Sequence, residues 1–205
     1  MPIKAKEKLE RSLGVKLFLK GTRCNSPKCA MVRRPYRPGI HGKKRRRALS
    51  EFGQQLLEKQ KIRISYGLNE SQMRRIFKKA LAKTSATGET VINALERRLD
   101  NTVFRLGLAL SRITARQYIS HGHFLVNGRK VNIPSYSVKT GDVISIKPTS
   151  KTLLIFKDLP NIIKKYNPPD WLELDVEKLE GRVKNLPHDI EIDFDINLVV
   201  DYYSK

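Results

Sequence analysis

The stretch SRITARQYISHGHFLVNGRKV, residues 111–131, predicts a short basic helix followed by a β-hairpin. Ser111 is a suitable N-cap because its hydroxyl oxygen can accept a hydrogen bond from a backbone N–H of the first turn. Apolar residues follow at roughly helical spacing, namely Ile113, Tyr118 and Ile119, and Gly122 then ends the predicted helix. Arg112 and Arg116 lie four positions apart. The helix therefore places both guanidinium groups on one face, an arrangement that suits adjacent phosphates.

The hairpin is the stronger of the two signals. Asn127 and Gly128 tolerate the positive φ of a type I′ turn, and apolar residues flank them. Another strand is predicted over residues 143–147, after a turn at residues 141–142. A small α/β unit is therefore expected over residues 93–148. Considered alone, a basic helix on a hairpin is also compatible with an ordinary solvated surface, so the rest of the chain must decide.

Charge favours a polyanionic partner. The 205 residues include 41 Lys and Arg against 20 Asp and Glu, a formal net charge of +21. Residues 1–50 hold sixteen cations and two acids, or +14, whereas residues 166–205 hold four cations and ten acids, or −6. A basic segment that lies along phosphates releases condensed counterions, so we expect binding to nucleic acid that weakens with salt.

The basic N-terminal segment is expected to be an extended arm that becomes ordered only on binding. Residues 24–47, CNSPKCAMVRRPYRPGIHGKKRRR, combine three prolines and two glycines with many cations, which disfavours helix and strand alike. Tyr36 offers a ring for stacking on an unpaired base. A solvated arm without a partner is the less favoured alternative at this charge. The arm's candidate RNA contacts are Arg33, Arg34, Tyr36, Arg37, His41, Lys43, Lys44, Arg45, Arg46 and Arg47.

Three helices are predicted between the arm and the hairpin. The first spans residues 52–66, and the second follows a cap at Asn69 or Ser71. The third would run without interruption from Val91 to Leu106. Beyond the hairpin we expect a weakly amphipathic helix over residues 153–166, a strand-like piece over residues 171–176, and an apolar stretch over residues 196–203. The acidic tail should pack on basic helices of its own chain.

Five blocks of sequence occur in a specific order and spacing. They are LGVKLFLKGTRCNSPKCAMVRRPYRPGIHG (13–42), LEKQKIRISYGLNESQMRRIF (57–77), LERRLDNTVFRLG (95–107), SRITARQYISHGHFLVNGRKVNIPSY (111–136) and DINLVVDYYSK (195–205). Together they closely resemble the bacterial small-subunit ribosomal protein S-four family, over essentially the whole chain. The resemblance implies a non-enzymatic, primary binder of 16S ribosomal RNA that nucleates assembly of the 5′ domain of the small subunit, with a role in translational accuracy.

The resemblance also implies an α+β fold in which a mostly helical domain carries an inserted α/β RNA-binding module, made of two helices and antiparallel strands. The expected domains are a basic arm at 1–47, a helical domain at 48–92 completed by 177–205, and an inserted domain at 93–176 with its core at 93–148. Expected RNA contacts outside the arm are Arg74, Arg98, Arg105, Arg112, Arg116, Gln117, Ser120, His121, His123 and Asn127.

Expected partners are 16S ribosomal RNA, neighbouring small-subunit proteins and messenger RNA where it enters the subunit. The chain shows no apolar run of the length that a membrane span requires, so we expect a cytoplasmic, ribosome-bound monomer. No cofactor is expected. Some family members hold zinc with two further cysteines near the N-terminus, but here Glu7 and Glu10 stand at those positions. Cys24 and Cys29 are therefore a half site, and His41 with two glutamates would complete it poorly.

Other classes of function fit less well. The triplet Arg98-Leu99-Asp100 resembles the Arg-Leu-Asp of pseudouridine synthases, in which the aspartate is catalytic. Here, however, Asp100 falls within a predicted helix, and no separate catalytic domain remains. We interpret Asp100 as a helix-surface acid paired with an arginine. A free-standing RNA chaperone with the same module would usually be shorter and lack the arm. DNA binding finds support in charge alone, without a recognition-helix or zinc-finger motif.

Overall fold

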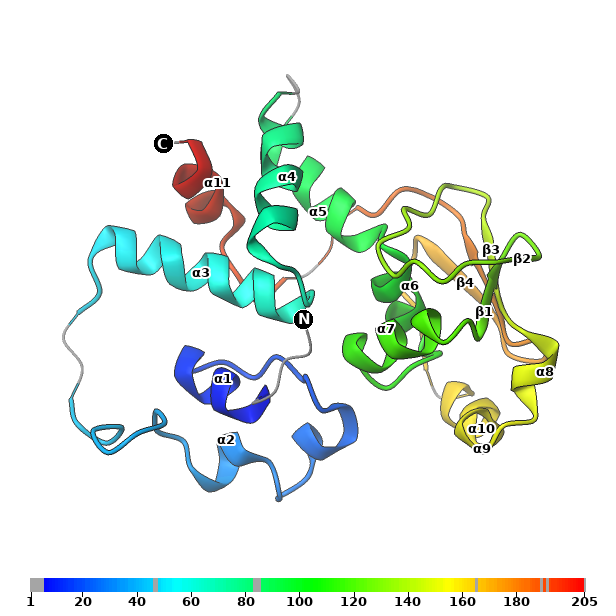
Figure 1. Ribbon diagram of the computed structural model, residues 1–205, viewed down its shortest axis with the longest axis horizontal. Coiled ribbons are helices and arrows are strands. Elements are labelled where there is room, and N and C mark those ends of the chain that lie inside the picture. Colours follow the sequence, from blue (N-terminus) through cyan, green and yellow to red (C-terminus); the bar gives the residue numbers. More distant parts are fainter. Residues whose placement is uncertain are drawn as a thin grey trace. The chain divides into compact units, whose positions relative to one another are not determined.

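The computed structural model describes residues 6–45, 48–82, 86–164, 166–188, 190 and 192–204 (Figure 1). The chain divides into two compact units. The first unit comprises Met1–Val91 and Glu191–Lys205, and the second comprises Ile92–Ile190. The boundary falls inside one helix, and each unit is described by itself. None of the helices in the described ranges combines the length and apolar composition needed to cross a membrane.

The first unit is helical. Its elements are α1 (Lys6–Leu13), η1 (Gly21–Asn25), α2 (Ala30–Arg33), α3 (Glu51–Ser65), α4 (Glu70–Leu81), α5 (Thr87–Glu96), which continues into the second unit, and α11 (Ile196–Ser204). Side-chain caps explain where two of them begin. The Ser50 Oγ atom accepts from the Gly53 N–H at 3.2 Å, and Asn69 forms a capping box with Gln72.

The core of the first unit lies where α11 packs on α3 and α4. Ile62, Met73 and Phe77 are completely buried there. The ring of Tyr203 stacks on that of Phe77, with 4.5 Å between centroids. The apolar face of the C-terminal helix therefore covers basic helices of its own chain, as its sequence led us to expect.

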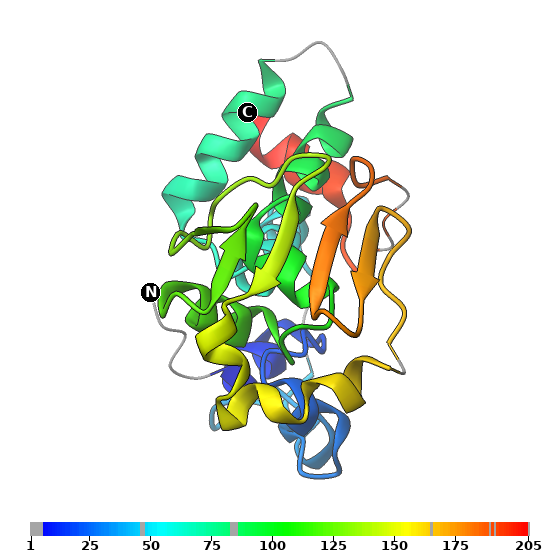
Figure 2. The ribbon, with the colours of Figure 1, turned by 90° about the vertical axis from the view of Figure 1, so that its right-hand side faces the viewer.

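The second unit is built on a five-stranded antiparallel sheet in the order β2-β1-β3-β5-β4 (Figure 2). Its strands are β1 (Phe124–Val126), β2 (Arg129–Lys130), β3 (Val143–Ile146), β4 (Leu172–Asp175) and β5 (Glu180–Val183). Its other helices are α6 (Leu99–Arg105), α7 (Arg112–Ser120), α8 (Pro148–Lys151), α9 (Leu154–Lys157) and α10 (Leu159–Ile163). The predicted α+β class and hairpin are confirmed.

The sheet and helices of the second unit share one hydrophobic core. Leu99, Ile119, Phe124 and Ile144 are fully buried in it. Gly181 on β5 permits close packing, since a Cβ atom there would lie only 2.3 Å from the Cδ1 atom of Leu106. The core fixes α6 and α7 against the sheet, and these helices carry the charged residues considered below.

The continuous helix predicted from Val91 to Leu106 is wrong, because the helix breaks at Arg97 and Arg98. Arg98 has extended backbone angles, φ −70° and ψ 137°. The backbone here bonds to a neighbouring loop, with the Leu99 N–H donating to the Tyr136 carbonyl at 2.8 Å and the Val138 N–H donating to the Arg97 carbonyl at 2.9 Å. Tertiary hydrogen bonds therefore replace two residues of helix that apolar spacing alone favoured.

The tail of the second unit also departs from expectation. The single helix predicted over residues 153–166 is interrupted, and the structure has the short helices α9 and α10 instead. The inserted domain was expected to end at residue 176, but the compact unit continues to Ile190. The reason is β5, which pairs with β3 on one side and β4 on the other.

Candidate nucleic-acid interface

Helix α7 holds its two arginines in defined positions. The Ser111 Oγ atom accepts from the Thr114 N–H at 3.2 Å and caps the helix, as predicted. The Nε atom of Arg112 donates to Asn101 Oδ1 at 2.7 Å, and its guanidinium lies 4.7 Å from the centre of the Phe104 ring. The Nη1 atom of Arg116 lies 4.0 Å from Asp100 Oδ2. Both side chains remain partly exposed, so the helix offers oriented cations at its surface.

A buried polar network underlies these arginines. Glu96 and Asp100 are carboxylates with 0% and 3% of their surface exposed. Glu96 accepts from Asn101 Nδ2 at 2.8 Å and from the Nε and Nη2 atoms of Arg105 at 3.0 and 3.1 Å. Asn101 thus links Glu96 to Arg112. A fully bonded network in a low-dielectric interior is rigid, and this one sets the direction in which Arg112 points.

Two of the predicted RNA contacts belong to this network instead. Arg98 is 5% exposed and forms a two-pronged pair with Asp100, at 3.0 Å from Nε and 2.7 Å from Nη2. Arg105 directs its guanidinium at Glu96. The guanidinium groups of Arg98 and Arg105 are therefore both engaged within the protein, and RNA contact by either side chain stays a prediction. The expected arginine partner of Asp100 is present, but Asp100 is buried rather than on the helix surface.

The end of α7 carries polar side chains of two kinds. Gln117, Ser120 and His121 are exposed, as a contact surface requires. His123 is half-buried between the rings of Tyr118 and Phe156, at centroid distances of 6.2 and 5.8 Å. Burial, helped by the charges of His121 and Lys147, lowers the pKa of His123. At neutral pH His123 is uncharged, so it can donate a hydrogen bond but does not add a cation.

The lowered pKa of His123 predicts a pH dependence of stability. Its folded-state pKa lies below the unfolded value of about 6.5, so the unfolded chain binds the proton more readily. We expect the free energy of unfolding to fall as the pH drops through about 6.5 toward the folded-state pKa. Proton NMR should give His123 a pKa below the unfolded value of about 6.5. Substitution His123→Gln should flatten the pH dependence of urea unfolding, and an unchanged slope would contradict the assignment.

Asn127 closes the hairpin with its own side chain. Its backbone has φ 50°, as the type of turn predicted from the sequence requires. Its Nδ2 atom donates to Asp142 Oδ1 at 2.8 Å, and its Oδ1 atom accepts from the Val143 N–H at 2.9 Å. Both ends of the carboxamide are engaged within the protein, so this side chain has a structural role in the turn, and its contact with RNA stays a prediction.

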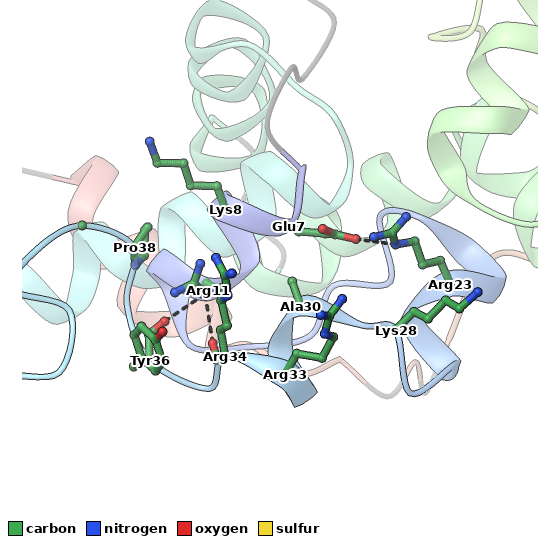
Figure 3. A pocket seen from close by; sticks show the side chains of 11 residues that line it. Glu7, Lys8, Arg11, Arg23, Lys28, Ala30, Arg33, Arg34, Tyr36 and Pro38 are labelled. Atoms are coloured by element: carbon green, nitrogen blue, oxygen red, sulfur yellow. Dashed lines mark hydrogen bonds and ion pairs between the residues drawn. The ribbon is translucent and has the colours of Figure 1, made fainter.

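In the first unit, α1 and the chain up to Gly39 form a second cationic surface, shown in Figure 3. Arg11 binds this region together, because its Nε atom donates to the carbonyls of Arg34 and Tyr36 at 2.9 and 3.0 Å. Its Nη2 atom donates to the Arg37 carbonyl at 3.3 Å. The guanidinium lies 5.1 Å from the centre of the Tyr36 ring. The expected extended loop is therefore wrong here, since a side chain of α1 fixes its path.

These contacts enclose a cavity of about 490 Å³. One acid, Glu7, and one aromatic ring, Tyr36, line it together with six cations. The cations are Lys8, Arg11, Arg23, Lys28, Arg33 and Arg34. A concave surface with this excess of positive charge suits a phosphate-rich ligand.

The structure brings only some of the predicted arm residues to this cavity. Arg33, Arg34 and Tyr36 line it. Arg37 donates to the Ser12 carbonyl at 3.2 Å, and Lys43 lies 5.3 Å from the centre of the Tyr36 ring. The exposed residues beyond the cavity are His41, Lys43, Lys44 and Arg45. Arg46 and Arg47 lie outside the described residues, and Arg74 is exposed on α4.

Sequence reasoning missed several members of both surfaces. Lys8, Arg11, Arg23 and Lys28 line the cavity but were not predicted. The charge pattern of α1, with cations at positions 6, 8 and 11, was the available signal. Glu96 and Asn101 were missed because their importance comes from burial and hydrogen bonding.

The two cysteines lie in a compact part of the first unit. Cys24 and Cys29 are 3% and 2% exposed, and burial raises the pKa of the Cys24 thiol. The Glu10 Oε1 atom accepts from the backbone N–H groups of Leu17 and Leu19, both at 3.1 Å. The other carboxylate, Glu7, pairs with Lys20 and Arg23. Within the described ranges no three His, Cys, Asp or Glu side chains gather as metal ligands.

Comparison with known proteins adds independent information. The sequence profile described as "Ribosomal protein S4/S9 N-terminal domain" matches residues 3–96, and that described as "S4 domain" matches residues 97–144. The chain is similar to proteins named "Small ribosomal subunit protein uS4". It is 49% identical over 200 residues to that of Halothermothrix orenii, 50% to that of Pelotomaculum thermopropionicum and 51% to that of Caldicellulosiruptor bescii. Each alignment covers 97% of this chain and 96% of the relative.

Proposed function

The chain belongs to the family of small ribosomal subunit protein uS4, and from this membership we propose that it is a primary 16S ribosomal RNA-binding protein. It is a structural constituent of the small ribosomal subunit, and it nucleates assembly of the 5′ domain. The observation that carries the proposal is the pair Arg112 and Arg116, which a buried carboxylate network orients on α7.

The two units contribute differently to this binding. In the second unit, oriented guanidinium groups and the exposed end of α7 contact phosphates and sugars, which fixes the register of the protein on the RNA. In the first unit, the cationic cavity and the exposed cations that follow it supply attraction through counterion release. Positions 1–50, with a charge of +14, provide the larger electrostatic share.

The remaining roles follow from the same assignment. The protein is not an enzyme, and it is present as a single copy in the cytoplasmic ribosome. Neighbouring small-subunit proteins contact it, and messenger RNA passes near it where it enters the subunit. Through these contacts it contributes to translational accuracy. An RNA-modifying role is disfavoured because Asp100, the aspartate of the Arg-Leu-Asp triplet, is buried and bonded to Arg98.

The protein uses no metal or other cofactor, and Cys24 and Cys29 remain thiols. We expect the purified chain to contain far less than one zinc ion per molecule, because Glu7 and Glu10 are already bonded within the protein. Elemental analysis by mass spectrometry measures this directly. Stoichiometric zinc whose removal by a chelator unfolds the first unit would contradict the proposal.

The central test is binding to the small subunit and to its RNA. The purified chain should co-sediment with small subunits reconstituted without their own copy of this protein. On isolated 16S RNA it should protect a junction between helices of the 5′ domain from chemical probing. Excess unrelated double-stranded RNA should not compete at moderate salt. Binding that is equally strong to any RNA, without a localised footprint, would overturn the assignment.

A further inference from the structure

A second cavity of the first unit, separate from the cationic one, lies among α3, α4 and α11. Its volume is about 540 Å³, within the range of about 300 to 1,000 Å³ that is typical of sites for small organic groups. Phe52 and Gln55 of α3, Arg74 and Lys78 of α4, and Tyr202 of α11 are among the residues that line it. None of the sequence motifs considered above pointed to this combination of aromatic, amide and cationic groups.

The aromatic wall is unusually exposed. Phe52 has 59% of its surface exposed, although it is a large apolar residue on an otherwise amphipathic helix. Its ring centre lies 5.7 Å from that of Tyr202, and the two planes are inclined by 33°. Tyr202 in turn meets Tyr203 edge to face at 5.2 Å. The wall therefore presents a fixed aromatic surface with room for another flat ring beside it.

Hydrogen bonds hold Glu70, the acidic residue that lines the cavity, in place. Lys59 is 5% exposed, and its Nζ atom donates to Glu70 Oε1 at 3.0 Å and to the Tyr202 hydroxyl at 3.3 Å. The Tyr203 hydroxyl also donates to Glu70, at 2.9 Å. Burial opposes ionisation of Glu70, but these hydrogen bonds outweigh it and lower the pKa of Glu70. Lys59 neutralises this carboxylate, so the cavity is not acidic.

Two features of the cavity are left without partners among the described residues, a buried acceptor and a pair of cations. Gln55 is 1% exposed, and its Nε2 atom donates to Glu51 at 3.1 Å. Its Oε1 atom is buried and has no hydrogen-bond partner among the described residues, which is a costly state for an acceptor. Arg74 and Lys78 are exposed, lie four positions apart on α4, and form no ion pair with other described residues. A ligand with a hydrogen-bond donor and a phosphate would provide a partner for the Gln55 acceptor and for the two cations.

We propose that this cavity binds one unstacked nucleotide of the RNA. Its base stacks on Phe52, an exocyclic amino group donates to Gln55 Oε1, and its phosphates lie against Arg74 and Lys78. Aromatic stacking combined with cations is the usual way in which proteins hold unpaired nucleotides. An acidic protein segment would pair with Arg74 and Lys78 but would leave the exposed ring and the amide acceptor unexplained. The inference rests on the RNA-binding function proposed above.

The test compares full-length variants for binding to 5′-domain 16S RNA. Phe52→Leu keeps an apolar side chain but removes the ring, and we expect about tenfold weaker binding, because the stacking of the base is lost. Phe52→Trp should retain the affinity of the wild type. Because Phe52 is uncharged, the slope of log affinity against log salt should not change. Gln55→Met should weaken binding about fivefold, because it removes the acceptor Oε1, although it also breaks the hydrogen bond from Nε2 to Glu51.

The cations of α4 provide a matched comparison. Lys78→Ala should weaken binding and reduce the salt slope, whereas Lys79→Ala, on the same helix but outside the cavity, should do so less. Ultraviolet crosslinking of the wild-type complex should attach a nucleotide to the peptide that contains Phe52 or the one that contains Tyr202. Wild-type affinity in Phe52→Leu, or crosslinks confined to the arm, would overturn the cavity assignment. Failure of the wild type itself to bind would instead refute the proposed function.

Discussion

Arg112→Ala combined with Arg116→Ala is expected to weaken binding to 5′-domain 16S RNA about 100-fold, from about 1–3 kcal/mol for each strong contact. The effect should be large because the network beneath α7 holds both side chains in place before the RNA arrives. Little side-chain entropy is then lost on binding. The salt slope should also fall by about 1 for each phosphate contact removed. Filter binding at several salt concentrations measures both quantities.

Charge-matched variants separate this effect from a general loss of positive charge. Lys157→Ala with Lys164→Ala removes the same charge from exposed positions on α9 and at the end of α10. This pair should have a much smaller effect on affinity. Arg112→Lys keeps the charge but loses the planar geometry, so we expect an intermediate affinity. Equal losses in the arginine and lysine pairs would show that the second unit binds RNA by charge alone.

Glu96→Ala is expected to lower the free energy of unfolding of the second unit by about 3–5 kcal/mol. Removing this fully buried carboxylate deletes its hydrogen bonds with Asn101 Nδ2 and with the Nε and Nη2 atoms of Arg105. The loss should also release Arg112, through Asn101, and weaken RNA binding at temperatures where the chain remains folded. The fluorescence of Trp171, the only tryptophan, reports urea unfolding of this unit.

Two further variants control for this result. Glu89→Ala is the same substitution at an exposed residue of the same helix. The unfolding midpoint of this variant should barely change. Glu96→Gln preserves the shape but removes the negative charge, so its stability should fall between those of the wild type and Glu96→Ala. A Glu96→Ala protein as stable as the wild type would show that the network does not maintain the fold.

The parts that the sequence predicted well depend on local signals. Ser111, Asn127 and Gly128 act through their own backbone or the next few residues, so the capped helix and hairpin could be located without tertiary information. The helices around Phe52 and Met73 were predictable because their apolar spacing matches a helix that buries one face. The basic arm could be located from its charge in the same way, because charge density depends only on the local composition of the sequence.

The parts that were missed depend on contacts between distant segments. The break at Arg98 exists because residues 136–138 bond to the backbone there. The strand β5 has only four residues, including Gly181, and it gains its stability from pairing on both edges. Arg98 and Arg105 look like surface cations in the sequence, and only the structure shows that each pairs with a buried carboxylate, Asp100 or Glu96. No local pattern encodes the partner of a buried charge.

The position of α11 in the chain has a consequence for synthesis. The helix begins at Ile196, 105 residues after Val91, yet it covers the apolar faces of α3 and α4. At translation rates of about 5–20 residues per second, the apolar faces of α3 and α4 remain uncovered for roughly 5–20 s before α11 is synthesised. During that interval the nascent chain displays a charge of +14 on its first fifty residues and an unfinished core behind them. Folding of the first unit is therefore completed only after α11 has been synthesised.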